Sequence, residues 1–170
     1  IRDSAGRCGV PADTYREIVS SCLRVLGDLY RYEQFPDPYG TEAWHDWGDE
    51  RSSFREFVEE CASSVNANIN SLKEEIWSSI CEQGGHNNFI IRPENLEVRL
   101  ASEEDPVWTC PSCQRPHLHP SCGVCTNCHE RLDEHSDSNA SDLQNRNYYA
   151  QAAKNRRPIR LHCEELTGQT

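Results

Sequence analysis

Hydrophobic residues recur every three or four positions over residues 14–32, which predicts an amphipathic helix with one apolar face. Pro11 lies just upstream and is typical of a helix start. Thr14 and Glu17 stand three residues apart, so their side chains can form a capping box, in which each accepts a hydrogen bond from the other's backbone amide. We therefore predict that the first long helix begins at residue 14.

A second stretch with the same spacing begins with the capping pattern Ser53-x-x-Glu56 and ends before Gly84-Gly85, a pair that favours a helix end. The asparagine-rich segment 66–70 interrupts it. A new capping pattern, Ser71-x-x-Glu74, follows, so the stretch is predicted to break into two helices. Because each apolar face needs a partner, we expect these helices to pack against one another.

Short β-strand candidates come next. Residues 89–91 form a brief apolar run, and residues 96–100 alternate apolar and charged side chains, as a half-exposed strand does. Asp, Ser and Asn dominate residues 133–141, which predicts a polar linker. Helical spacing resumes over residues 142–155, and another candidate strand lies at residues 159–163.

These elements predict an α+β protein with a helical N-terminal half, a small β-rich metal module, and then a helix and a strand. The expected division is a helical region over residues 1–87, short strands and the metal module over 88–132, a linker over 133–141, and a helix plus strand over 142–170. The chain starts at Ile1 without a methionine, so we expect it to be a piece of a longer protein.

Two Cys-x-x-Cys pairs carry the clearest chemistry in the chain. They are Cys110 with Cys113 and, after eleven further residues, Cys125 with Cys128. Four thiolates that arrive as two tight turns suit a tetrahedral zinc ion, and the loop between the pairs can fold back to bring them together. The spacing predicts a zinc ribbon with a structural Zn²⁺, because four protein ligands leave no open coordination position.

Other ligands for this site remain possible from the sequence. Cys122 and Cys125 also form a Cys-x-x-Cys pair, although Gly123 favours the turn that leads to Cys125 and Cys128. Histidines are numerous here, and they would allow a cross-braced module with two zinc ions: His117, His119, His129 and His135. The simpler interpretation is that His117 and His119 lie on the surface of the module or contact a partner.

Charge is unevenly distributed over the 170 residues, whose net charge is −11. Residues 28–60 hold ten acidic side chains and three arginines, whereas residues 143–163 hold five basic side chains and no acidic one. A basic stretch next to exposed aromatic rings is typical of nucleic-acid contacts. The candidate nucleic-acid-binding residues are Tyr148, Lys154, Arg156, Arg157 and Arg160.

Cysteine usage and hydropathy bear on location. Five of the ten cysteines crowd into residues 110–128, while Cys22, Cys61 and Cys81 fall at or beside apolar positions of helical segments. Buried reduced thiols next to a metal cluster are typical of cytosolic proteins, so we expect a cytoplasmic location. The longest apolar runs span only a few residues, so no membrane contact is predicted.

Several enzyme classes lack their motifs in this chain. No Gly-Lys pair occurs, so there is no Walker A loop, and DEAD/DEAH, His-Glu-x-x-His and Gly-x-Ser-x-Gly patterns are also missing. The chain by itself is therefore not expected to hydrolyse a nucleotide, and the sequence leaves open whether it belongs to an enzyme. A histidine-rich nuclease built on a zinc frame stays a further alternative.

A group of motifs in the second half carries a family resemblance. They are Trp108-x-Cys110-x-x-Cys113, His117-Leu118-His119, Gly123-x-Cys125-x-x-Cys128, Tyr148-Tyr149 and the run Arg160-Leu161-His162-Cys163-Glu164-Glu165-Leu166-Thr167-Gly168-Gln169-Thr170. This region, roughly residues 85–170, resembles large superfamily-2 helicases of the DEAD/DEAH type from bacterial antiphage defence systems of the Druantia and DISARM kind. The helical first half shares much less with them.

The resemblance implies that the chain is a fragment with a zinc-ribbon insert, which precedes a strand of the second RecA-like domain of an ATP-dependent DNA helicase or translocase. ATP and Mg²⁺ would then bind only to the parent protein, and DNA or another protein of the defence complex would be the partner. Only Cys110, Cys113, Cys125 and Cys128 carry over, as metal ligands. The alternative is a protein-interaction module that zinc stabilises, with the acidic aromatic segment 35–50 meeting a basic partner.

Overall fold

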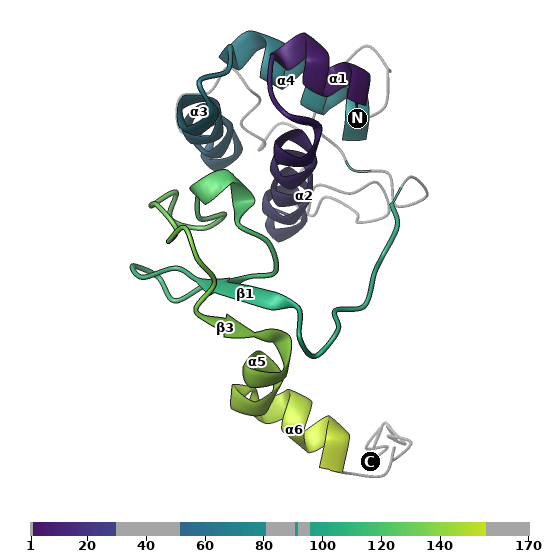
Figure 1. The fold of residues 1–170 in the computed structure, drawn as a ribbon, viewed down its shortest axis with the longest axis vertical. Helices are drawn as coiled ribbons and strands as arrows, with labels where there is room; N and C mark the ends of the chain where they lie inside the picture. Colours follow the sequence, from purple (N-terminus) through teal and green to yellow (C-terminus); the bar gives the residue numbers. More distant parts are fainter. Residues whose placement is uncertain (1, 30–51, 81–90, 92–95, 156–170) are drawn as a thin grey trace, which may run out of the picture.

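The computed structural model describes residues 2–29, 52–80, 91 and 96–155 (Figure 1). The first half contains four helices: α1 (Arg2–Cys8), α2 (Ala12–Asp28), α3 (Ser53–Val65) and α4 (Ile69–Ile80). A small antiparallel sheet and two further helices follow: β1 (Pro106–Thr109), β2 (Pro116–His117), β3 (Ser138–Asn139), α5 (Ala140–Arg146) and α6 (Tyr148–Asn155). The predicted α+β class with a helical N-terminal half is therefore confirmed.

α2 and α4 begin two residues earlier than predicted, whereas α3 begins at Ser53, as predicted, but with a different capping residue. α2 starts at Ala12 after Pro11, without a side-chain cap, so the predicted capping box at Thr14 is wrong. Proline fixes φ near its helical value and has no amide to satisfy, so it can open the helix alone. At α3 the capping side chain is Ser52, whose hydroxyl accepts a hydrogen bond from the Arg55 amide at 3.3 Å.

The predicted break at the asparagine-rich segment is confirmed. α3 ends at Asn66, which adopts a left-handed conformation with φ 53°, a conformation that asparagine tolerates well. The Asn68 side chain then accepts hydrogen bonds from the amides of Asn70 and Ser71, at 3.0 and 3.1 Å, and so satisfies amides at the start of α4. Asn68 therefore caps α4, three residues before the pattern at Ser71 predicted.

The apolar faces of α2, α3 and α4 meet in one core, as predicted, and α1, which was not predicted, adds Ala5 and Cys8 to it. Its largest fully buried side chains include Tyr15, Ile18, Phe57, Leu72 and Ile76, which come from α2, α3 and α4. Full burial of an aliphatic or phenyl side chain contributes roughly 1.5–3 kcal/mol each. These helices thus stabilise themselves in the way that their sequence periodicity indicates.

The sheet contains a strand that the sequence did not predict. β1 is central, with Trp108 opposite His117 of β2 and Val107 opposite Ser138 of β3. The segment 133–141, predicted as a linker, therefore includes strand β3 and the start of α5. A two-residue strand of polar side chains shows no alternation, so its pairing comes from backbone contacts with β1.

Two other predictions in the second half need correction. Residues 96–100 form no regular element, and Val98 and Leu100 are 91% and 87% exposed, because no described strand pairs with them. The single helix predicted over 142–155 is divided at Asn147, where the chain is extended. The Asn147 side chain accepts a hydrogen bond from the Ala150 amide at 3.0 Å and so begins α6.

The metal module is seated directly on the helices. A short turn, η3 (Ser121–Gly123), contacts both α2 and α3, and Val124 next to it belongs to the helical core. Figure 1 shows the module below these two helices, with α5 and α6 at the far end. The acidic segment 35–50, the pair Gly84-Gly85 and the strand predicted at 159–163 lie outside the described residues.

Candidate metal centre

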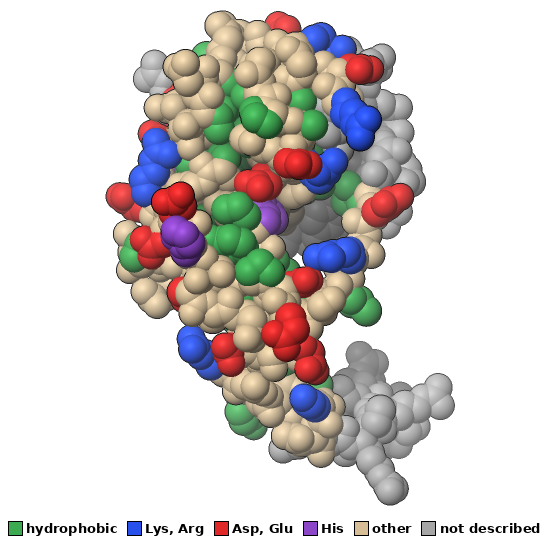
Figure 2. Space-filling model, viewed as in Figure 1, with side chains coloured by type: hydrophobic (Ala, Val, Ile, Leu, Met, Phe, Trp, Pro, Cys, Tyr) green, Lys and Arg blue, Asp and Glu red, His purple; other side chains and the backbone are tan. Residues whose placement is uncertain are grey.

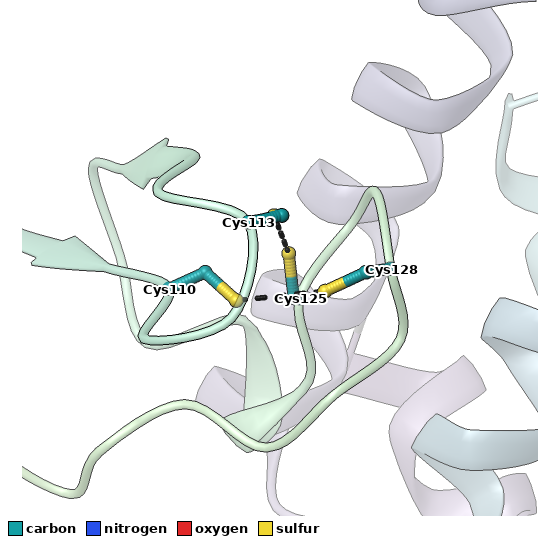
Figure 3. A group of neighbouring side chains, drawn as sticks. All are labelled: Cys110, Cys113, Cys125 and Cys128. Carbon is teal, nitrogen blue, oxygen red and sulfur yellow. Dashed lines mark hydrogen bonds between the residues drawn. The ribbon is translucent and has the colours of Figure 1, made fainter.

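The two cysteine pairs lie together in space. One sulfur from each of the four cysteines, Cys110, Cys113, Cys125 and Cys128, falls within 4.8 Å of all the others. The Sγ atoms are 3.5 Å apart between Cys110 and Cys128, and also between Cys113 and Cys125 (Figure 3). A tetrahedral zinc ion at about 2.3 Å from each sulfur requires sulfurs about 3.8 Å apart. The arrangement can therefore hold a metal ion after small shifts.

The first turn, Cys110 to Arg115, is held by backbone hydrogen bonds. The Cys110 amide donates to the Arg115 carbonyl at 2.9 Å, and the Gln114 amide donates to the Cys110 carbonyl at 2.9 Å. Gln114 has φ 62°, in the left-handed region. This conformation reverses the chain right after the second cysteine, so both thiols point inward.

The second turn, Cys125 to Glu130, repeats this design. The Cys125 amide donates to the Glu130 carbonyl at 2.9 Å, and the His129 amide donates to the Cys125 carbonyl at 3.1 Å. His129, four residues after the first cysteine as Gln114 is, has φ 61°. The two turns are thus equivalent in backbone although they share only their cysteines. The cysteine spacing predicted the two turns, but without a glycine at either left-handed position it did not indicate where the chain reverses.

The thiols differ in their affinity for protons. Burial opposes ionisation of Cys113, but hydrogen bonds from the backbone of Arg115 and the side chain of Asn127 lower the pKa of Cys113 to about 6. Burial raises the pKa of Cys125 to about 12 and raises that of Cys128 as well. A metal ion that binds here must displace protons from the buried thiols, so its affinity will depend on pH.

Two arginines lie beside the first turn. Arg24 of α2 donates from Nη1 to the Pro116 carbonyl at 2.6 Å, and Arg115 forms an ion pair with Asp28 of α2. Burial and the neighbouring charge of Arg115 lower the pKa of Arg24, while Asp28 and Cys125 act in the opposite direction. Four thiolates around a divalent ion carry a net charge of −2, so Arg24 of α2 and Arg115 of the turn itself place positive charge near the site.

The histidines stay outside the sulfur cluster. Contrary to the prediction of a surface position, His117 is 1% exposed, and its Nε2 has no hydrogen-bond partner among the described residues. Burial, with the charges of Arg24 and Arg115, lowers the pKa of His117 to about 4. His119 instead accepts a hydrogen bond at Nδ1 from the Ser121 amide at 3.1 Å. Burial also lowers the pKa of His119, so both rings are neutral at pH 7.

His129 and Cys122 face the helices. The His129 ring lies 6.1 Å from the Phe57 ring, centroid to centroid, and its Nε2 is 3.4 Å from the Ser53 hydroxyl. Cys122 packs against the helical core, and its carbonyl accepts a hydrogen bond from the Ser64 hydroxyl at 2.6 Å. Among the described residues, the group of cysteines close enough to share a metal ion therefore includes Cys125 and Cys128 but not Cys122.

The predicted nucleic-acid residues are only partly in view. Tyr148 and Lys154 lie on α6, both exposed, and Tyr148 stacks edge-to-face on Tyr149 with centroids 5.6 Å apart. Arg156, Arg157 and Arg160 lie outside the described residues. α6 lies at the far end of the molecule, beyond β3 and α5 (Figure 1). The nucleic-acid role of these residues stays a prediction.

No family model, curated protein or solved structure is similar enough to this chain to match it. The helicase resemblance therefore rests on its sequence motifs alone. Among the described helices, none has the length and apolar character required to cross a membrane.

Proposed function

We propose that the four cysteines bind a structural Zn²⁺ and that this ion holds the module on the helical bundle. The proposal rests on one observation, the convergence of four sulfurs from two equivalent turns. A soft, all-thiolate ligand set favours zinc or an iron–sulfur centre over hard cations. Four protein ligands leave no coordination position for a substrate, so the centre supports folding and carries no catalysis.

Metal analysis tests this proposal. Protein purified with and without added zinc should contain one zinc per chain by elemental analysis, and Cys110→Ser should lose most of it. Cys8→Ser is a matched control, because Cys8 is also buried but its Sγ donates to the Ser71 carbonyl in the helical half. Absence of zinc in the purified chain, or equal loss in both variants, would contradict the proposal.

At the finer level, we propose that the chain is an accessory region of an ATP-dependent DNA helicase or translocase and engages nucleic acid through α6. The motif resemblance and the exposed aromatic pair Tyr148-Tyr149 next to Lys154 support it. Exposed rings stack on bases without sequence preference, at about 1–3 kcal/mol per base. Fluorescence anisotropy with single-stranded and duplex DNA should show binding at low salt that weakens in Tyr148→Ala, while Leu118→Ala, another exposed apolar residue, should bind normally.

A second candidate, a protein-interaction module, is favoured by the charge distribution. Described arginines are mostly paired with carboxylates: Arg7 with Glu75, Arg16 with Asp13, Arg55 with Glu59, Arg99 with Asp105 and Arg115 with Asp28. Figure 2 shows acidic and basic side chains interspersed over one face, without a broad basic patch. Absence of DNA binding at low salt would favour this candidate. The nuclease alternative loses support, because a buried His117 cannot reach a substrate.

A further inference from the structure

Three cysteines that lie outside the metal cluster gather where the module meets the helices. Cys22 of α2 and Cys61 of α3 are fully buried, and Cys122 of η3 is half-buried against the same core. All three are reduced. Burial and a side-chain interaction with Cys122 raise the pKa of Cys61 well above its usual value, and Cys22 adds to this effect. Three thiols that the zinc proposal does not use thus lie at the interface.

Hydrogen bonds fix the backbone of Cys122 between α2 and α3. Ser64 lies one turn after Cys61, on the same face of the helix, and its hydroxyl donates to the Cys122 carbonyl at 2.6 Å. From the other side, the Cys122 amide donates to the Glu17 carboxylate of α2 at 3.3 Å. The backbone of Cys122 is therefore fixed at both its amide and its carbonyl by the two helices.

The turn that carries Cys122 is also strained. Ser121, Cys122 and Gly123 all have positive φ, at 53°, 46° and 80°. A left-handed conformation is unfavourable for a non-glycine residue, so two such residues in succession need outside support. A hydrogen bond of 2.6 Å between the buried hydroxyls of Ser21 and Ser121 supplies part of it. The helices thus hold the turn that carries Cys122 against α3, one helical turn from Cys61.

We propose that Cys61 and Cys122 form a redox-responsive thiol pair that closes into a disulfide between α3 and the metal module. The substrate class is a low-molecular-weight disulfide such as glutathione disulfide. The proposal goes beyond the zinc and helicase assignments, because it concerns thiols that neither of them uses.

The reaction balances in two exchange steps. Cys122, the more accessible thiol, loses its proton to solvent and attacks one sulfur of glutathione disulfide, which releases one glutathione thiolate and leaves a mixed disulfide on Cys122. Cys61 then loses its proton and attacks the Cys122 sulfur, which releases the second glutathione. Two protein thiols are oxidised and one disulfide is reduced to two thiols. Because burial keeps Cys61 protonated, the second step should be slow, over minutes to hours.

Closure of this bond would join the module to the helices without metal. Cross-links restrict the unfolded chain and so stabilise the folded one, and we expect a rise in Tm of roughly 5–10 °C for a chain of this size. The bond would thus hold the module in place under oxidising conditions that threaten the zinc thiolates.

The test uses the zinc-loaded chain, reduced and then incubated with glutathione disulfide under anaerobic conditions. Free thiols are alkylated, and the disulfide-linked peptides are identified by mass spectrometry. We expect a Cys61–Cys122 cross-link as the main product, with zinc retained. It should be absent in Cys122→Ser and in Cys61→Ala, and it should form normally in the control Cys8→Ser.

Several outcomes would overturn the proposal. They are a cross-link that joins Cys122 to Cys22 in place of Cys61, a mixed disulfide on Cys122 that never resolves, and oxidation of the zinc thiolates with loss of metal before any other thiol reacts. Circular dichroism of each variant confirms folding, and because Cys122 is only half-buried, Cys122→Ser remains informative if Cys61→Ala unfolds. A cross-linked chain whose Tm stays unchanged would contradict the stabilising role alone.

Discussion

The helical half and the metal module are held together by different interactions. The core of the helices contains large apolar side chains such as Tyr15 and Phe57, all buried. The second core cluster consists of Leu132 and the four cysteines that form the sulfur cluster. Small modules with so little apolar surface need a metal ion or disulfides to fold. The helical half is therefore stabilised by hydrophobic burial, whereas the fold of the metal module depends on its four cysteine ligands and the metal ion that they bind.

The contact between the helical half and the metal module depends on neither of these alone. It combines apolar packing of Val124 and Cys122 on the helical core with hydrogen bonds between Ser21 and Ser121, from Arg24 to the Pro116 carbonyl and from Ser64 to the Cys122 carbonyl. These partners come from α2 and α3 on one side and from the loop between the cysteine pairs on the other. The helices thus offer the module hydrogen-bond partners at fixed positions, but the module must fold before it can form these bonds.

Removal of zinc is expected to have the largest effect. Structural zinc binding contributes roughly 10–16 kcal/mol of apparent free energy in small modules at pH 7. After exhaustive chelation, hydrogen exchange should show loss of amide protection over residues 106–132, while α2, α3 and α4 keep most of theirs. Loss of protection in the helices at the same chelator concentration would show that the two regions unfold as one unit.

Truncation of the helical core comes next. Phe57→Ala should lower the free energy of unfolding by about 3–5 kcal/mol, because the ring is fully buried between α3 and its neighbours. Urea denaturation of the zinc-loaded chain measures it. Arg16→Ala is the matched control, since Arg16 is exposed and, within the described part of the chain, paired only with Asp13, and it should change stability by less than about 0.5 kcal/mol. A cost below 1 kcal/mol for Phe57→Ala would mean that the module stabilises the helices.

Sequence patterns predicted the helical half better than the module. A helix repeats its apolar signal over many turns, so α2, α3 and α4 were recognisable, although α2 ends at Asp28 and not at residue 32, and the starts of α2 and α4 were misplaced. The short helix α1 was not predicted. The cysteine spacing predicted which sulfurs meet. It could not predict β3, because two polar residues carry no periodicity, nor the burial of His117, because a neutral histidine in a strand has no sequence signal of its own.

That burial makes the module sensitive to acid. The folded state holds the pKa of His117 near 4, whereas an unfolded histidine titrates near 6.5. Between these values only the unfolded state takes up the proton, so stability falls as pH falls from about 6.5 to 4, by up to about 3 kcal/mol. Denaturation of zinc-loaded wild type and His117→Gln at several pH values should show a smaller fall in the variant. Protonation of the thiolates affects both proteins, so parallel curves would contradict this role.

A substitution at the interface between the helices and the module should lower stability by a smaller amount. Arg24→Gln removes a charged donor to the Pro116 carbonyl and should cost about 2 kcal/mol, since hydrogen bonds from charged groups contribute roughly 1.5–3 kcal/mol. It should also weaken zinc binding about tenfold in competition with a chelator, because a positive charge next to the thiolates is lost. Arg16→Gln, on the same helix, should change neither. Weaker stability with unchanged zinc affinity would mean that Arg24 acts on the interface alone.

The smallest effects concern the left-handed residues in each region. Asn66 ends α3 with φ 53°, and Gln114 closes the first cysteine turn with φ 62°. Glycine relieves such a conformation, so Asn66→Gly should raise the melting temperature slightly, by an amount that corresponds to a few tenths of a kcal/mol. Gln114→Gly should gain more from the backbone, but it loses hydrogen bonds from the side-chain amide to the carbonyls of Cys110 and Pro111, at 3.3 and 3.1 Å.

We therefore expect Gln114→Gly to leave the melting temperature nearly unchanged in the zinc-loaded chain and to lower zinc affinity, because a freer turn must be ordered when the metal binds. Asn66→Gly should leave zinc affinity unchanged. If both variants instead raised stability equally and neither altered zinc binding, the first turn would be fully organised by its backbone before the metal arrives. The module would then resemble the helices more closely than its small apolar core suggests.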